Sequence, residues 1–255
     1  MQYGLIGEKL SHSYSKIIHE QIGEYSYELH PLSKEEFSDF MERKEFLGIN
    51  VTIPYKKAVI PYLSHIDDRA KAIGAVNTIV NRNGQLFGYN TDYNGLVYTV
   101  EKNHIPIREK KVLVLGNGGA SMAVSAMLYA QSVREVYTVK YKKEPNVLTY
   151  EEAKELHSDA DVIINTSPVG MYPNIDASPI DLTPYHSLSA VFDLIFNPLK
   201  TKFILQAESM GIPAFNGLEM LVVQAKYAAE YFMDTKISDE IIEPILKKVI
   251  SKLDL

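Results

Sequence analysis

Short apolar runs and longer stretches with helical spacing alternate along the first hundred residues. Apolar or alternating runs predict strands at residues 3–6, 26–31, 46–52, 75–80 and 85–89, the last two joined as a hairpin. Ile17, Ile18 and Ile22 have the spacing of one helix face, and Ser33 with Glu36 has the pattern of a capping box that begins a second helix. Strands separated by helices are typical of a layered α/β domain with parallel pairing.

The same alternation starts again after residue 98 and continues to about residue 215. Residues 111–115 are a continuous apolar run of the kind expected for a strand buried on both faces. A glycine cluster and a predicted helix at 120–131 follow it, and further strands are predicted at 136–139, 161–165 and 191–195. The last forty residues carry apolar positions at helical spacing. The pattern therefore predicts a second α/β unit followed by helices.

Composition narrows the class of protein. The chain has 255 residues, 46% of them hydrophobic, so it can form one large domain or two compact ones. A net charge of −6 argues against a nucleic-acid partner, and the absence of cysteine excludes disulfides and thiol nucleophiles. No apolar run approaches the roughly 18 residues of a membrane span, and no signal-peptide pattern begins the chain, so we expect a cytoplasmic protein. The seven histidines show no paired ligand spacing, which disfavours a metal site.

The glycine cluster is the first candidate site. Gly116-Asn-Gly-Gly-Ala-Ser121 follows a predicted strand and begins a predicted helix, the context that a dinucleotide-binding loop requires. Gly116 would form the tight turn, and Gly118 and Gly119 would let the backbone approach a pyrophosphate at the helix N-terminus. Ala120 and Ser121 begin the helix, and Ser121 is small enough for close packing on the strand. The alternative is an ordinary glycine-rich turn.

The residues after the next strand favour NADP. An NAD site would place an acidic side chain there for the ribose hydroxyls. This strand runs instead into Lys140-Tyr-Lys-Lys143, with three ammonium groups and no acid, which would attract a 2′-phosphate. The alternative is a solvated basic turn.

The first unit carries residues suited to interconverting a carbonyl and an alcohol. Ser13 and Ser15 could hold a carboxylate at a helix N-terminus, or simply cap that helix. Thr52 and Lys56 follow a strand that stops at Pro54, although the adjacent lysine leaves open which ammonium points inward. Asp92, near the junction of the two units, could face that lysine, which would pass a proton to a developing alkoxide while the aspartate orients it. For either charged residue alone, a surface ion pair is the simpler interpretation.

Together these motifs resemble the shikimate dehydrogenase family over nearly the whole chain. The matching segments are residues 11–15, Asn50-Val-Thr-Ile-Pro-Tyr-Lys56, Gly74-Ala-Val-Asn-Thr78, Asn90-Thr-Asp92, the glycine cluster, Asn165-Thr-Ser-Pro-Val-Gly-Met171, Asp193-Leu-Ile-Phe-Asn-Pro198 with Thr201, and Asn216-Gly-Leu-Glu-Met-Leu221 with Gln224. Any one segment could arise by chance, but all of them in the same order are specific to the family.

The resemblance implies reversible, NADP-linked reduction of 3-dehydroshikimate to shikimate in aromatic amino-acid biosynthesis. It implies Lys56 as proton donor and acceptor with Asp92 as its partner. It assigns Ser13 and Ser15 to the substrate carboxylate, Thr52, Asn77 and Gln224 to ring hydroxyls or neighbouring groups, and Thr166, Gly217 and Met220 to the nicotinamide side of the cofactor. It also implies an α/β fold of two domains. These are a substrate domain at residues 1–97 and 216–255, to which the C-terminal helices return, and an inserted Rossmann-like NADP-binding domain at residues 98–215. We expect a monomer or homodimer whose only other partner is the small-molecule substrate.

Two departures from the family pattern change the expectations. Phe196 stands where the family usually has tyrosine, so substrate binding should be weaker by about one hydrogen bond, roughly 0.5–1.5 kcal/mol.

The family's Asn-Arg pair after the second strand is absent, and the 21 residues between Val139 and Asp161 leave room for one helix, at residues 150–156. Lys140 and Lys142 would then replace the arginine. Alternatives are a relative that uses quinate or NAD, and a weakly active relative that binds shikimate-like ligands.

Overall fold

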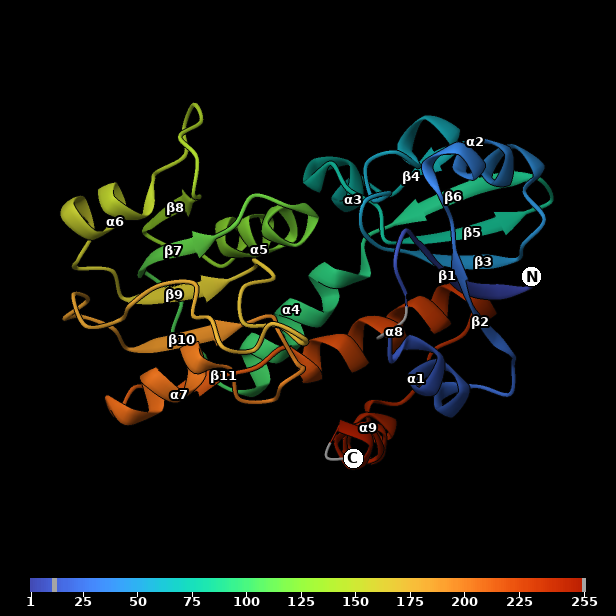
Figure 1. Ribbon diagram of the computed structural model, residues 1–255. Helices are drawn as coiled ribbons and strands as arrows, with labels where there is room; N and C mark the ends of the chain where they lie inside the picture. Colours follow the sequence, from blue (N-terminus) through green and yellow to red (C-terminus); the bar gives the residue numbers. More distant parts are fainter. Residues whose placement is uncertain (11–12, 254–255) are drawn as a thin grey trace. The chain divides into compact units, whose positions relative to one another are not determined.

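The computed structural model describes residues 1–10 and 13–253, so Ser11 and His12 of the first matching segment lie outside the described residues. The chain forms two compact units (Figure 1). The first comprises Met1–Gly95 with Leu221–Leu255, and the second comprises Leu96–Met220. The chain passes from one unit to the other within α4 (Thr91–Lys102) and again within α8 (Leu218–Met233). The prediction of a two-domain α/β fold is confirmed.

The first unit is built on a mixed sheet with the strand order β2-β1-β3-β5-β6-β4. Its strands are β1 (Tyr3–Gly7), β2 (Tyr27–Pro31), β3 (Gly48–Val51), β4 (His65–Ile66), β5 (Thr78–Arg82) and β6 (Gln85–Tyr89). β1 pairs in parallel with β2 and β3, whereas β5 is antiparallel to both β3 and β6. The predicted hairpin is present as β5 and β6. The expectation of parallel pairing is wrong for β3 and β5, which are antiparallel although a helix separates them in the sequence.

Alternation along these strands supplies two packed faces. Ile6, Ile49 and Ile79 pack on one face against α2 (Lys34–Arg43), while Leu5 and Val80 pack on the other against α8. Figure 1 shows α2 on one side of the sheet and α8 on the other. The remaining helices of this unit are α1 (Ser15–Ile22), α3 (Asp68–Ile73) and α9 (Ile242–Leu253), with short 3₁₀ turns at Ile60–Tyr62 and Asp239–Ile241.

A capping box begins α2, and the ion pairs of a buried lysine stabilise α8. The predicted capping box is present at α2: Ser33 Oγ accepts a hydrogen bond from Glu36 N–H, and the Glu36 carboxylate accepts one from Ser33 N–H. Within α8, the nearly buried Lys226 forms ion pairs with Glu230 at 2.9 Å and with Asp239 at 2.7 Å. The pair with Asp239 links α8 to the 3₁₀ turn that precedes α9.

The second unit has a parallel sheet with the strand order β11-β10-β9-β7-β8. Its strands are β7 (Lys111–Leu115), β8 (Glu135–Val139), β9 (Val162–Asn165), β10 (Ala190–Asp193) and β11 (Ala214–Phe215). Its helices are α5 (Gly119–Ala130), α6 (Tyr150–Leu156) and α7 (Lys202–Ser209). Within residues 140–161, all of which are described, α6 is the only helix and has the predicted bounds.

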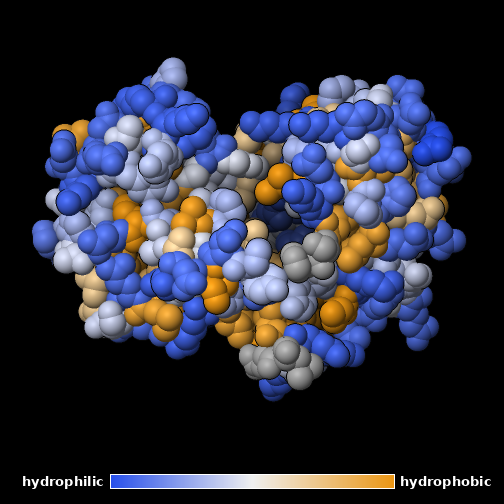
Figure 2. All heavy atoms as spheres, in the orientation of Figure 1, coloured by the Kyte–Doolittle hydropathy of each residue, from blue (hydrophilic) through white to orange (hydrophobic). Residues whose placement is uncertain are grey.

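Burial of this sheet follows the apolar runs of the sequence. Leu113 and Leu115 pack against residues of α6 and α7, including Ala153 and Phe203. On the side drawn in Figure 2, the surface of each unit is mainly hydrophilic, with hydrophobic residues in small groups. No helix within the described part of the chain is both long and apolar enough to cross a membrane.

A buried carboxylate holds the strand ends of the second unit together. Asp193, at the end of β10, accepts hydrogen bonds from Asn165 Nδ2 at 2.9 Å, Thr201 Oγ1 at 2.6 Å and Ile195 N–H at 3.1 Å. Burial raises the pKa of Asp193 to about 6 despite these bonds. This network gives the segment from Asp193 to Thr201 a structural role, because it fixes the chain that leads from β10 into α7.

Candidate active site

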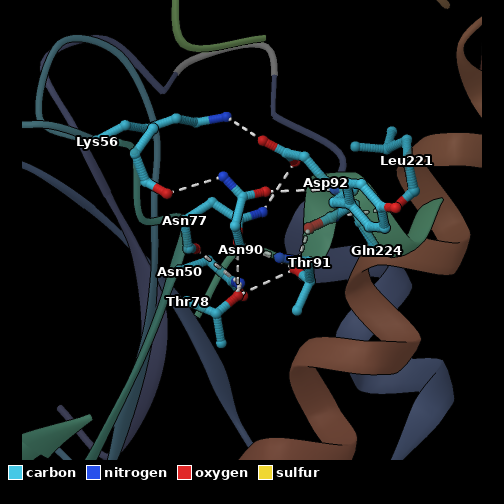
Figure 3. Close-up of polar contacts among 11 residues, drawn as sticks. Asn50, Lys56, Asn77, Thr78, Asn90, Thr91, Asp92, Leu221 and Gln224 are labelled. Atoms are coloured by element: carbon cyan, nitrogen blue, oxygen red, sulfur yellow. Dashed lines mark hydrogen bonds and ion pairs between the residues drawn. The ribbon is translucent and has the colours of Figure 1, made fainter. Parts of the chain in front are cut away.

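A buried lysine–aspartate ion pair is the centre of the candidate site in the first unit. Lys56 Nζ lies 2.5 Å from Asp92 Oδ2, and the two side chains are only 16% and 9% exposed (Figure 3). Lys57 is exposed. The structure therefore settles which of the adjacent lysines points toward Asp92.

Different elements position the two charged residues. Lys56 follows the end of β3, and its backbone carbonyl accepts a hydrogen bond from Val76 N–H at 2.8 Å. Asp92 lies in the first turn of α4, a helix that the sequence analysis did not predict. A carboxylate in the first turn of a helix is stabilised by the helix dipole. The side chain of Asn90, in the same matching segment as Asp92, supports the fold by donating to Ala75 O and accepting from Tyr93 N–H.

Asn77 holds the second oxygen of the aspartate. Its Nδ2 donates to Asp92 Oδ1 at 2.8 Å, and its Oδ1 accepts from Thr91 N–H at 2.7 Å. Because a backbone N–H can only donate, this contact fixes which end of the amide is oxygen and directs the NH₂ group toward Asp92. Asp92 thus has one oxygen on Lys56 and the other on Asn77.

A further layer of buried polar side chains supports Asn77. Thr78 Oγ1 lies 3.0 Å from Asn77 Oδ1, and Asn50 Nδ2 donates to Thr78 Oγ1 at 3.0 Å. Tyr27 Oη in turn donates to Asn50 Oδ1 at 2.7 Å. The sequence analysis missed the roles of Asn50 and Thr78, although both lie in the matched segments. The available signal was that polar residues interrupt apolar strands, since buried polar groups must find partners.

The structure places the predicted substrate residues of this unit in different surroundings. Gln224, on α8, approaches the network through Thr91 Oγ1, which lies 3.5 Å from its Oε1. Ser13 Oγ accepts a hydrogen bond from Ser15 N–H at 3.2 Å, so this contact is local. Thr52 packs its methyl group over Gly7, where a Cβ would come within 2.5 Å. Among the described contacts, none joins Ser13, Ser15 or Thr52 to the lysine–aspartate pair.

The glycine cluster of the second unit has the geometry of an anion-binding turn. Gly116 has φ +108°, and a Cβ there would lie 2.8 Å from Thr166 Oγ1, so only glycine fits. Gly118 is the N-cap of α5, and a Cβ there would meet open space. Among the described residues, no side chain caps this helix. Its first N–H groups are therefore available to a phosphate, and the turn fits a dinucleotide.

The other predicted cofactor residues of this unit are held by close contacts or are buried. Thr166 Oγ1 donates to Leu115 O at 2.7 Å, which places it beside the glycine turn. Ser121 is buried in the first turn of α5, as its small size predicts. A Cβ at Gly217 would lie 2.0 Å from Leu194 O, so this position also requires glycine, and the nearby Met220 is buried.

Two lysines of the basic segment after β8 have carboxylate partners. Lys140 forms an ion pair with Glu144, and Lys143 forms one with Glu152 at 2.6 Å. Residues 140–143 contain no acid, but the turn brings carboxylates from later positions against two of the three ammonium groups. Asn117 Nδ2 also donates to Glu144, at 3.1 Å, and thereby links this segment to the glycine turn.

No group of three or more histidine, aspartate or glutamate side chains in the described ranges is arranged to hold a metal ion.

A parallel α/β unit with a phosphate-binding turn, joined to a unit with a buried lysine–aspartate pair, has the features of a nicotinamide-dependent oxidoreductase.

Comparison with known proteins identifies the family. Residues 5–79 match the model of the shikimate dehydrogenase substrate binding domain. Shikimate dehydrogenase (NADP(+)) of Clostridium beijerinckii is 39% identical over 94% of this chain and 95% of its own length, and that of Caldicellulosiruptor bescii is 36% identical over 90% and 88%. The chain belongs to the shikimate dehydrogenase family.

Solved structures agree over the full length. Shikimate dehydrogenase 1 from Peptoclostridium difficile superposes with a TM-score of 0.91 at 37% identity and covers 99% of both chains. Shikimate 5-dehydrogenase from Thermus thermophilus, in complex with NADP(H) and shikimate, gives a TM-score of 0.86 at 28% identity and covers 97% of this chain and 99% of that one.

Proposed function

We propose that this chain catalyses the reversible, NADP-linked reduction of 3-dehydroshikimate to shikimate, a step toward chorismate and the aromatic amino acids. The observation that carries the proposal is the buried Lys56–Asp92 pair, held by Asn77, in a chain whose full-length relatives are named NADP-dependent shikimate dehydrogenases. NADP, when bound, supplies or accepts the hydride.

Lys56 is the proton donor for reduction and the acceptor for oxidation. Its ammonium group would stabilise negative charge that develops on the carbonyl oxygen and then pass a proton to it. Asp92, in contact with Lys56 Nζ, keeps that group in one position. Asn77 prevents the aspartate from rotating, because it occupies the other carboxylate oxygen.

The hydrogen-bond donors that the fold leaves unused indicate how the site would bind an acid with several hydroxyl groups. Asn77 Oδ1 is occupied by Thr91 N–H and by nearby hydroxyls, so its second N–H is the group left for a ring hydroxyl. Gln224 already donates to Leu221 O, which leaves it one further N–H. Thr52 would supply a hydroxyl, and Ser13 with Ser15 would hold the carboxylate.

The residues that would hold NADP are Gly116, Gly118, Gly119, Ala120 and Ser121 at the phosphate turn, Lys140 toward the ribose phosphate, and Thr166, Gly217 and Met220 toward the nicotinamide. The uncapped N-terminus of α5 supports the first group. The cytoplasmic location and the monomeric or homodimeric state stay predictions.

An absorbance assay for the reduced nicotinamide, NADPH or NADH, with shikimate or quinate and with NADP+ or NAD+, tests the proposal. We expect the highest kcat/KM with shikimate and NADP+. A higher value with quinate would overturn the substrate assignment. Absence of turnover with every combination, in protein that melts cooperatively, would favour the weakly active, ligand-binding relative.

A further inference from the structure

The turn after β8 brings an acidic side chain back to the strand end. Lys140 N–H donates to Leu148 O at 2.8 Å, and Val147 N–H donates to Glu144 O at 3.2 Å, so residues 140–148 fold into a compact loop. Gly116 N–H donates to Val139 O at 2.8 Å, which holds the base of this loop against the glycine turn. The side chains of Lys140, Glu144 and Asn117 meet in this region.

Glu144 uses both carboxylate oxygens there. Oε1 pairs with Lys140 Nζ, and Oε2 accepts from Asn117 Nδ2 at 3.1 Å. The hydrogen bond from Lys140, with a smaller contribution from Asn117, lowers the pKa of Glu144, so the carboxylate is charged at neutral pH. The side chains of Lys140 and Glu144 are 38% and 39% exposed, so a ligand can reach both.

The position of this pair matters because of where a dinucleotide lies in such a fold. The end of the second strand faces the adenosine ribose, where an acidic side chain binds the 2′-hydroxyl of NAD and a basic one accommodates the 2′-phosphate of NADP. β8 is the second strand of this unit, since the chain runs from β7 through α5 to β8. The chain thus places both kinds of side chain at this point, paired with one another.

We propose that Glu144 is a specificity-determining residue that reduces the preference for NADP over NAD, an inference that rests on the proposed function. A 2′-phosphate must displace Glu144 from Lys140 and is repelled by its charge. A 2′-hydroxyl displaces nothing and can donate a hydrogen bond to the carboxylate. The ion pair therefore opposes NADP at the lysine that would otherwise favour it.

Calorimetric dissociation constants for NADP+ and NAD+ test the proposal in the wild-type protein and in Glu144→Gln. The substitution keeps the size of the side chain and removes its charge. We expect the Kd for NADP+ to fall about threefold to tenfold, as expected when a like charge is removed from beside a partly exposed phosphate, while the Kd for NAD+ stays the same or rises. Glu155→Gln, the same change of charge on the exposed face of α6, is the control and should move neither value.

Adding Lys140→Gln to Glu144→Gln should reduce the gain, because the freed ammonium group is one of its two sources and only the relief of repulsion remains. If the ratio of the two constants in Glu144→Gln equals that of Glu155→Gln while the wild-type protein binds NADP+, the specificity role is wrong and the proposed function stands. If the wild-type protein binds neither nucleotide, both proposals fail.

Discussion

A lysine, a carboxylate and an asparagine meet in each unit of this molecule with the same connectivity. The Asp92 cluster comprises Lys56, Asp92 and Asn77, and the Glu144 cluster comprises Lys140, Glu144 and Asn117. In both, the ammonium group contacts one carboxylate oxygen and the asparagine Nδ2 contacts the other. The surroundings differ: the lysine and carboxylate are 16% and 9% exposed in the first cluster, and 38% and 39% exposed in the second.

Burial gives the two clusters different capacities. In the Asp92 cluster the charges are poorly screened by solvent, and Thr78 and Asn50 hold Asn77 from behind, so the ammonium group has one stable position. The Glu144 cluster lies on a surface loop, where solvent screens an ion pair strongly and its partners can exchange. The same three groups therefore suit proton transfer in one unit and adjustable selectivity in the other.

The largest difference between the clusters should appear when each lysine loses its charge. Lys56→Met should lower kcat by about 10²- to 10⁴-fold, the usual contribution of a positioned proton donor, with a much smaller change in KM. Steady-state kinetics in both directions measure this. Lys57→Met, at the adjacent exposed position, is the matched control and should keep nearly full kcat. Comparable losses in both variants would mean that Lys56 is not the proton donor.

The residues that support the Asp92 cluster should also make the stability of the first unit decrease at acidic pH. Tyr27, which donates to Asn50, stacks on His19 with ring centroids 4.0 Å apart, and burial lowers the pKa of His19 to about 3. In the unfolded chain His19 takes up a proton as the pH falls through about 6.5, whereas in the folded chain it stays neutral until about pH 3. The free energy of unfolding is therefore highest above pH 6.5 and decreases as the pH falls. The loss should be about 2 kcal/mol between pH 7 and pH 5.

Urea unfolding at several pH values measures that loss. His19→Phe retains a ring for stacking and should reduce the slope of stability against pH, although it also removes the hydrogen bond with Tyr25 Oη. His186→Phe, at an exposed position, should leave the slope unchanged. An unchanged slope in His19→Phe would contradict the assignment.

The sequence predicts most of the fold because long apolar runs and capping patterns are local signals. The run at β7 and the capping box at Ser33 both appear where predicted. β4 and β11 were missed because two residues carry no periodicity. α4 was missed because Gly95 and its β-branched neighbours have low helix propensity, which burial of Leu96 and Val100 overrides.

The candidate site is less predictable, because its contacts join residues far apart in the chain. The residues alone left open whether Lys56 or Lys57 meets Asp92. The family resemblance favoured Lys56, and the structure places Lys56 against Asp92. The sequence analysis did not predict the contact in the Glu144 cluster, although the acid lies only four residues after Lys140. The conformation of the turn brings Lys140 and Glu144 together, and the composition of residues 140–143 does not reveal that conformation.

A substitution behind Asn77 tests whether the second layer matters. Thr78→Val removes the hydroxyl that lies beside Asn77 Oδ1 and accepts from Asn50, while keeping the shape of the side chain. We expect kcat to fall about threefold to tenfold, equivalent to one hydrogen bond, with KM nearly unchanged. Thr78→Ser should restore kcat because it restores the hydroxyl. Equal losses in both variants would indicate a packing role and contradict a positioning role.

The smallest effect, and the one that separates the clusters most clearly, is the response to salt. Lys140→Met should leave kcat at saturating NADP+ unchanged and raise the Kd for NADP+ about twofold to fivefold, because an exposed ammonium group contributes little. Raising the ionic strength from about 0.05 M to about 0.5 M shortens the Debye length below about 5 Å, so most of this difference should disappear. The kcat defect of Lys56→Met should persist at both ionic strengths, since protein atoms cover that pair. If salt abolished the Lys56→Met defect as well, burial would not be what distinguishes the two clusters.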